Sequence, residues 1–192
     1  MNFNIILEKK LLVIFKFIIL IPIFVLTLFL FISCEKDRDI NTPGQTNPDN
    51  SEPIKAADFI LKTLDGDSIR LSSLEGKVVV LFFYGNLCSS CRVAAVDIEN
   101  ELIQPYSYRS DFVLLGLDLS NGNSSELESF KSFTGATFPL LFNASSLVST
   151  YETTVDRLIV VDKQGYIQFR GEQAAINDLE VVKTKVEMLL NS

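Results

Sequence analysis

Histidine is missing altogether from this chain of 192 residues. Its absence excludes Ser-His-Asp and Cys-His catalysis, and also zinc, copper or haem sites that depend on histidine ligands. Cysteine is scarce, because only Cys34, Cys88 and Cys91 occur, and three cysteines cannot build a disulfide-rich scaffold. Basic residues number 17 against 24 acidic ones, and this net charge of −7 argues against a nucleic-acid partner. What remains is 47% hydrophobic and 21% charged, which is typical of a globular protein.

The first 33 residues have the pattern of an export signal. Three lysines are followed by an apolar run at 17–32 and then by a small residue, Ser33. The motif Phe31-Ile32-Ser33-Cys34 resembles the lipobox of bacterial lipoproteins, and this resemblance implies that Cys34 is lipidated and becomes the mature N-terminus. The alternative is an uncleaved anchor, since the apolar run extends back to Leu11 and then reaches the ~20 residues of a spanning helix. Both interpretations place the domain outside the cytoplasm, in the cell envelope, where disulfides persist.

Residues 34–54 are expected to form a flexible tether. They are rich in proline, asparagine, aspartate and threonine and offer nothing that could form a core. The folded domain is predicted at 55–192, which is long enough for one well-buried core. Without residues 1–33 the chain carries 14 basic and 23 acidic residues, a net charge of −9, so it does not adhere to anionic lipid by charge. Membrane attachment therefore depends on the lipid at Cys34 or on an anchoring helix.

The first half of the domain is predicted to contain a hairpin, two buried strands and a helix. The hairpin turns at Asp65-Gly66, and unbroken apolar runs at 77–83 and 112–119 are typical of strands covered on both faces. Between these strands, apolar residues at helical spacing predict a helix that starts at the cysteine pair. It is expected to end near Gln104, because Pro105 disfavours helix at the residue before it.

The second half is predicted to continue the alternation of helices and strands. A helix capped by Ser125 and Glu128 is expected to present an apolar face of Leu127, Phe130 and Phe133. Strands are expected at 138–142, 157–162 and 166–170, before a C-terminal helix whose apolar side includes residues 179, 182, 186, 189 and 190. This order predicts an α/β fold with a mixed sheet, helices on both faces and an N-terminal hairpin.

Cys88 and Cys91 lie at the expected junction between a buried strand and a helix. Their spacing lets them close a small disulfide, while the helix dipole and the free N–H groups of the first turn stabilise a thiolate. Thiols placed in this way have pKa values of roughly 3.5–7.5 instead of ~8.5. The thiolate is the attacking species in disulfide exchange. Cys88 is therefore predicted to be the exposed nucleophile, and Cys91, on the inner face of the helix, the resolving thiol.

Two other roles for the cysteine pair are less favoured. A zinc site needs two further ligands, and the domain has no other cysteine and no histidine. A purely structural disulfide of this spacing closes almost no loop, so its entropic stabilisation is small. A redox role is the favoured interpretation, and no metal or organic cofactor is expected.

Several segments follow the order found in a known superfamily: 57–83, Cys88-Ser89-Ser90-Cys91-Arg92, Phe138-Pro139-Leu140-Leu141 and 151–167. They resemble the thioredoxin-like redoxins, which include the AhpC/TSA group and the membrane-tethered TlpA-like disulfide reductases. The resemblance covers nearly all of 55–192 and implies a thioredoxin fold with its active site at the N-terminus of the first long helix. It also implies protein thiols and disulfides as substrates, and a membrane electron donor that recycles the pair.

Two departures from this family concern the residues around the nucleophile. Leu87 stands where the family usually has tryptophan, so a flat, substrate-facing aromatic side chain is lost. Ser89 and Ser90 replace a pair that often includes proline, and this pair tunes the redox potential in the family.

A third departure is Asp156, which occupies the position of the family's cis-proline just before the strand at 157–162. The Val155–Asp156 peptide bond is expected to be trans, because a cis bond without proline costs about 3 kcal/mol. In the family this loop faces the cysteines and presents the substrate. A carboxylate there raises the pKa of a neighbouring thiol, so Cys88 is predicted to be less acidic and less reactive than in relatives that have proline.

Three functions are compatible with these observations. The first is an extracytoplasmic thiol–disulfide oxidoreductase acting on proteins. The second is a thiol peroxidase, because Arg157 lies where peroxidases of the superfamily carry a supporting arginine. Those peroxidases have threonine or serine three residues before the reactive cysteine; here that cysteine would be Cys91, and Cys88 fills the hydroxyl position. The third is a non-catalytic binding module, which the missing tryptophan and cis-proline favour and the retained cysteine pair opposes.

Overall fold

The computed structural model describes residues 53–192, so the predicted signal, Cys34 and nearly all of the tether lie outside the described residues. Within 53–192, no helix combines the length and the hydropathy needed to cross a membrane. These residues form a five-stranded sheet with the strand order β5-β4-β3-β6-β7, and a separate two-stranded hairpin.

The sheet is mixed, as the sequence predicts. Its central strand, β3 (Val78–Tyr84), is buried along its whole length, which explains the unbroken apolar run. On one side β4 (Phe112–Asp118) pairs with it in parallel, and β5 (Leu140–Leu141) pairs in parallel with β4. On the other side β6 (Arg157–Val161) is antiparallel to β3, and β7 (Ile167–Arg170) is antiparallel to β6.

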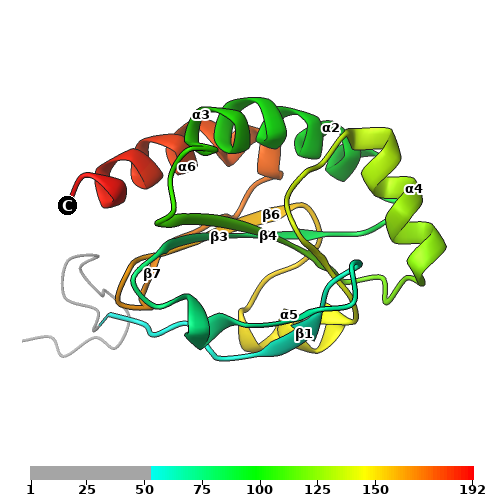
Figure 1. Ribbon diagram of the computed structural model, residues 1–192, viewed down its shortest axis with the longest axis horizontal. Coiled ribbons are helices and arrows are strands. Elements are labelled where there is room, and N and C mark those ends of the chain that lie inside the picture. Colours follow the sequence, from blue (N-terminus) through cyan, green and yellow to red (C-terminus); the bar gives the residue numbers. More distant parts are fainter. Residues whose placement is uncertain (1–52) are drawn as a thin grey trace, which may run out of the picture. The chain divides into compact units, whose positions relative to one another are not determined.

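The long helices cover one face of the sheet, and short elements cover the other (Figure 1). The first face packs against α2 (Ser89–Ile98), α4 (Ser124–Thr134) and α6 (Ala175–Leu190). The second face packs against the hairpin of β1 (Ile60–Lys62) and β2 (Ser68–Arg70), together with three short helical segments, η1 (Leu71–Leu74), η3 (Ala144–Ser146) and α5 (Leu147–Thr150). The predicted α/β architecture and its hairpin are confirmed, with helices on both faces but long ones only on the first.

The helix after the cysteine pair ends at Tyr106, close to the predicted end near Gln104, but Pro105 lies inside its last turn and does not stop it. It continues through a π-helical segment, η2 (Glu99–Ile103), into a last short turn, α3 (Gln104–Tyr106). The Gln104 N–H bonds to the Glu99 carbonyl, five residues back. In a regular α-helix the ring of Pro105 would clash with the carbonyl four residues earlier, and the wider π-helical turn relieves this clash.

The start and the exposed face of α4 also differ from the sequence-based expectation. The capping box is formed by Asn123 and Glu126, two residues earlier than the predicted Ser125 and Glu128. Leu127 and Phe130 are buried as expected, whereas Phe133 is 66% exposed. Its ring lies under the guanidinium of Arg92 from α2. Phe133 therefore contributes a cation–π contact at the surface and not a core contact.

Candidate active site

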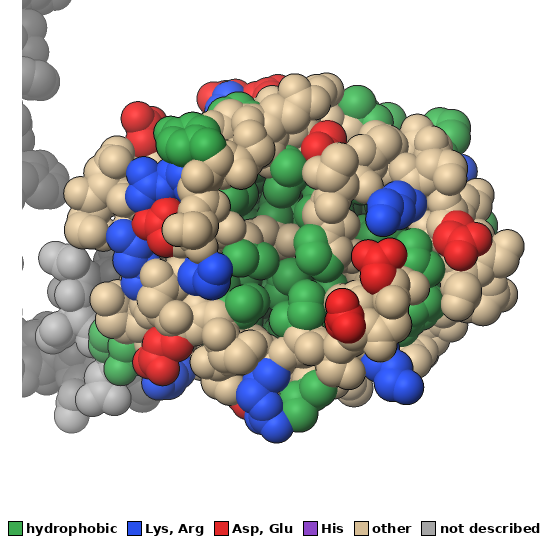
Figure 2. All heavy atoms as spheres, in the orientation of Figure 1, with side chains coloured by type: hydrophobic (Ala, Val, Ile, Leu, Met, Phe, Trp, Pro, Cys, Tyr) green, Lys and Arg blue, Asp and Glu red, His purple; other side chains and the backbone are tan. Residues whose placement is uncertain are grey.

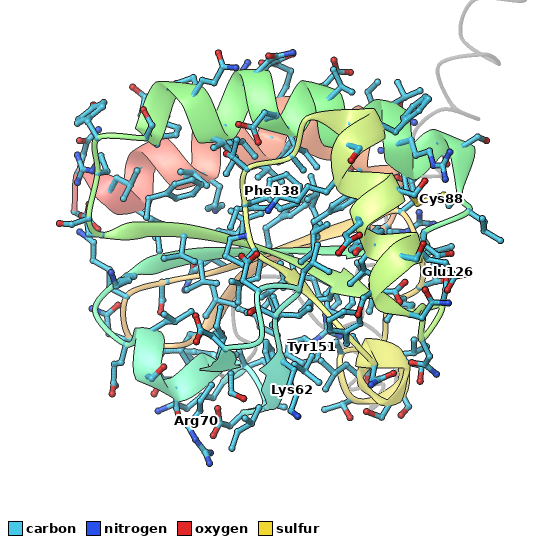
Figure 3. The ribbon with its side chains drawn as sticks, turned by 45° about the vertical axis from the view of Figure 1, so that its right-hand side comes forward. Lys62, Arg70, Cys88, Glu126, Phe138 and Tyr151 are labelled. Carbon is cyan, nitrogen blue, oxygen red and sulfur yellow. A yellow bond between two sulfur atoms is a disulfide. The ribbon has the colours of Figure 1, made fainter. Side chains whose placement is uncertain are left out.

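Cys88 is the N-cap residue of α2, at the point where the chain leaves β3 and turns back over the sheet. It forms a disulfide with Cys91, and the two Cα atoms are 5.2 Å apart. The Cys88 sulfur accepts a hydrogen bond from the Cys91 N–H at 3.1 Å. This N–H belongs to the first helical turn, where N–H groups have no carbonyl partner within the helix. Figure 3 shows Cys88 at the end of the helical layer, on the rim of the molecule.

The two sulfurs differ in exposure. Cys88 is half-buried, whereas Cys91 is completely buried within the core cluster beneath α2. An incoming disulfide can therefore approach Cys88 but not Cys91. This is the arrangement that the predicted roles of attacking and resolving thiol require.

The loop before Cys88 is held by backbone interactions. The Asn86 carbonyl accepts hydrogen bonds from Nε and Nη2 of Arg92, at 3.2 and 2.9 Å. The Cys88 N–H bonds to the Gly85 carbonyl at 3.0 Å. Space is tight at Gly85, because a Cβ there would lie 3.0 Å from Ser120 Oγ. Nothing in the sequence pattern points to Asn86, since it contributes only its backbone carbonyl.

The carboxylate of Asp156 lies against the cysteine pair. One carboxylate oxygen and the sulfurs of Cys88 and Cys91 are all within 4.8 Å of one another. Asp156 is only 6% exposed, and its Oδ1 accepts a hydrogen bond at 3.2 Å from the N–H of Ala175, in the first turn of α6. No motif in the sequence pointed to this oxygen as a third donor beside the two sulfurs, because Asp156 has no fixed spacing from the cysteine pair.

The backbone of Asp156 has a left-handed conformation, with φ +63°. Aspartate tolerates this region better than most residues. The conformation is held by the Asp156 N–H, which donates to the Phe83 carbonyl at 2.7 Å. Residues 53–192 contain no cis peptide bond, so the predicted trans bond between Val155 and Asp156 is confirmed.

Exposed apolar side chains occur next to Cys88 and in the two segments that hold the Asp156 carboxylate. Leu87, directly before Cys88, is 80% exposed, and Val155 and Ile176 lie exposed next to Asp156 and Ala175. Ser89 and Ser90 are also exposed, and the Ser90 hydroxyl is 3.3 Å from the Cys88 sulfur. Figure 2 shows one face of the whole domain, where acidic and basic side chains are mixed around a central group of apolar ones; Cys88 lies at the rim (Figure 3).

Arg157 is partly buried at the start of β6. Its Nη1 donates to the backbone carbonyl of Asp156 at 2.9 Å, and the structure gives it no hydrogen bond to either sulfur. Near the site, the phenol of Tyr84 is buried in the same core cluster as Cys91. Burial, and to a lesser degree the charge of Asp118, raises the pKa of Tyr84 above its ordinary value, so this phenol stays neutral.

The AhpC/TSA family model matches residues 54–170. The thioredoxin-like protein YneN of Bacillus subtilis (strain 168) is 30% identical over 122 residues, which are 61% of this chain and 69% of that protein. The thiol-disulfide oxidoreductase ResA of Bacillus thuringiensis (strain Al Hakam) is 28% identical over 123 residues, 62% of this chain and 69% of the relative.

A solution structure of a proposed protein disulfide isomerase from Bacteroides thetaiotaomicron superposes with a TM-score of 0.65 at 25% identity. The superposition covers 73% of this chain and 90% of the other. The fold, the position of the cysteine pair at the start of α2 and the family match agree, and the chain therefore belongs to the AhpC/TSA family of the thioredoxin-like redoxins.

Proposed function

We propose that this protein is a membrane-tethered, extracytoplasmic thiol–disulfide oxidoreductase that acts on other proteins. One observation carries the proposal. A half-buried sulfur, that of Cys88, lies at the N-terminus of α2 and is bonded to a fully buried partner, Cys91. The similarity to proteins named as thiol-disulfide oxidoreductases supports the same activity.

The reaction consists of two exchange steps at Cys88. In the reduced protein, the Cys88 thiolate attacks one sulfur of a substrate disulfide, forms a mixed disulfide and releases the other substrate sulfur as a thiolate. The Cys91 thiolate then attacks the Cys88 sulfur and releases the second substrate thiolate. Two electrons pass from the pair to the substrate, and the pair becomes the disulfide seen in the structure. A membrane electron donor restores the dithiol by the reverse exchange.

Protein substrates fit the surroundings of Cys88. The exposed side chains of Leu87, next to Cys88 in the chain, and of Val155, across the loop from Gly85, offer apolar contacts near the sulfur. No metal or organic cofactor is needed for exchange between thiols and disulfides. The apolar rim can therefore hold a segment of a protein chain while its disulfide reaches Cys88.

The tether is the second part of the proposal. Cys34 follows the export signal, and a lipid on its sulfur would hold the domain at the membrane at the end of residues 34–54. Metabolic labelling with an alkyne fatty acid tests this, because label is expected on the wild type and not on Cys34→Ala. Equal labelling of both proteins would contradict lipidation at Cys34.

Trapping of substrates tests the exchange reaction. The Cys91→Ser variant is expected to accumulate mixed disulfides with envelope proteins in cells, because no thiol remains to resolve the bond at Cys88. Cys88→Ser is the matched control and is expected to trap nothing, since Cys91 is buried. Trapping by neither variant would favour a non-catalytic binding module, and equal trapping by both would refute Cys88 as the nucleophile.

Peroxidase activity is the alternative within the same family, and the structure disfavours it. By position, the peroxide-reducing thiol would be Cys91, which is fully buried and which peroxide cannot reach without opening of the site. Arg157 bonds to a backbone carbonyl and does not contact the sulfurs by a hydrogen bond. The reduced protein is therefore expected to reduce a protein disulfide while remaining inert to hydrogen peroxide; rapid peroxide consumption would reverse this choice.

A further inference from the structure

We infer that the reduced form of the site binds a thiophilic divalent cation, with Zn²⁺ as the best match, through the sulfurs of Cys88 and Cys91 and the carboxylate of Asp156. The inference uses the cysteine pair of the proposed function, but it does not depend on redox activity. It assigns to Asp156 a role as the third ligand.

The geometry needs little movement of the carboxylate. Around a tetrahedral zinc ion with Zn–S of about 2.3 Å and Zn–O of about 2.1 Å, neighbouring donor atoms are roughly 3.5–3.8 Å apart. The three donor atoms already lie within 4.8 Å of one another. On reduction the two sulfurs are no longer bonded and separate, which opens the space between them and the Asp156 oxygen for the ion.

Two helix N-termini support this set of negatively charged donors. The Cys91 N–H of α2 donates to the Cys88 sulfur, and the Ala175 N–H of α6 donates to the Asp156 carboxylate. Hydrogen bonds of this kind orient metal ligands and stabilise their anionic form. Neither hydrogen bond prevents metal coordination, because a thiolate and a carboxylate each have further lone pairs.

The backbone of Asp156 is a further, independent observation. A buried residue other than glycine is kept at φ +63° by the hydrogen bond from its N–H to Phe83. Such conformations persist where the surrounding structure requires them, and they are concentrated at functional sites. Here the conformation accompanies the placement of the carboxylate beside the sulfurs.

The donor set also selects the metal. Two thiolates with one carboxylate suit zinc, which accepts sulfur, nitrogen and oxygen ligands, whereas a carboxylate is a poor match for the softer copper(I) ion. Three protein ligands leave the fourth tetrahedral position open for water or for a ligand from outside. Zn²⁺ would displace the protons of both thiols, and it would exclude disulfide formation while it is bound.

Zinc titration of the full-length chain tests the inference. Cys34→Ala is included in every protein so that only the pair at the site supplies sulfur. A phosphine reductant gives two electrons to the disulfide and becomes the phosphine oxide, with water supplying the oxygen and the two thiol protons. The reductant is then removed without oxygen, and Zn²⁺ is titrated against a chromophoric chelator. We expect one Zn²⁺ per reduced chain and none per oxidised chain. Cd²⁺ used in place of Zn²⁺ is expected to give the ultraviolet charge-transfer band of thiolate ligands.

Asp156 variants decide whether the carboxylate is a ligand. Asp156→Asn keeps the shape of the side chain, and Asp156→Gly keeps the left-handed backbone, so at least one is expected to fold. Both are expected to weaken Zn²⁺ binding by about tenfold or more. Asp67 is an exposed aspartate on the hairpin turn, and Asp67→Asn is the matched control. This variant is expected to bind Zn²⁺ with the same affinity as the parent chain.

Two results would overturn the inference: no Zn²⁺ binding by the reduced chain, or equal affinity in the parent and both Asp156 variants. Disulfide exchange with a protein substrate, measured on the same samples, separates the two proposals. A chain that exchanges disulfides and binds no Zn²⁺ refutes only the metal site. A chain that binds Zn²⁺ and exchanges no disulfides refutes only the proposed function.

Discussion

At the scale of single residues, the most informative position is Asp156. The sequence has an aspartate where the family has proline. The structure shows that this replacement affects both a hydrogen bond and the backbone conformation of the loop. Asp156 donates its N–H to the Phe83 carbonyl and has a positive φ. Proline can do neither, because it has no N–H and its φ is close to −65°. Asp156→Pro would therefore remove the hydrogen bond to the Phe83 carbonyl and force a different backbone conformation at this position.

The charge of Asp156 is expected to raise the pKa of the Cys88 thiol. A negative group within 4.8 Å of the sulfur disfavours the thiolate, against the favourable effect of the α2 N-terminus. Asp156→Asn removes the charge and preserves the shape, so the Cys88 pKa is expected to fall. The pH dependence of the alkylation rate of reduced protein, measured in the presence of a chelator, gives this pKa. A pKa that stays the same or rises in the variant would contradict the prediction.

At the scale of elements, local chemistry decides where helices begin. Residues 123–128 contain several possible capping residues, and both Asn123 and Ser125 have a glutamate three positions later. The helix starts after Asn123, because the loop that leaves β4 is fixed by Asp118. This buried carboxylate accepts the N–H groups of Ser120 and Gly122, which places Asn123 at the point where α4 begins.

The capping box of α4 is expected to contribute measurably to stability. Asn123→Ala removes the side-chain bond to the Glu126 N–H and is expected to lower the free energy of unfolding by about 1 kcal/mol. Ser125→Ala is the matched control; it lies inside the first turn and is expected to change stability by much less. Urea unfolding of the two variants measures the difference. A larger effect at Ser125 would show that the helix starts later in solution.

At the scale of the whole molecule, several side-chain hydrogen bonds connect segments that are distant in the sequence. One of them is formed by Arg109, which binds both carboxylate oxygens of Asp111 and also the carbonyl of Leu190 at the end of α6. This arrangement joins the start of β4 to the C-terminal helix. The hydrogen bonds from Arg109 lower the pKa of Asp111 to about 2.

The free energy of unfolding is therefore expected to fall in acid, because the Asp111 carboxylate becomes protonated. This carboxyl has a lower pKa in the folded chain than the value of about 3.9 in an unfolded one. Its contribution is complete above about pH 4 and is lost as the pH falls towards 2. The side chains are partly exposed, so the contribution is about 1 kcal/mol or less. Urea unfolding at neutral and acidic pH is expected to show a deficit of Asp111→Asn that disappears in acid; a deficit independent of pH would refute the ionic origin.

The sequence by itself determined the fold class, because the unbroken apolar run of β3 and the alternating periods are local patterns that report burial directly. It also identified the cysteine pair, since a strand followed by a helix start is readable from neighbouring residues. The family resemblance indicated that the loop of Asp156 faces the cysteines. Only the tertiary structure decided that one Asp156 oxygen lies within 4.8 Å of both sulfurs and that its carboxylate receives a hydrogen bond from α6. These contacts depend on the pairing of β6 with β3, which brings residue 156 to the end of β3. No local periodicity in the sequence predicts a contact between residues so far apart.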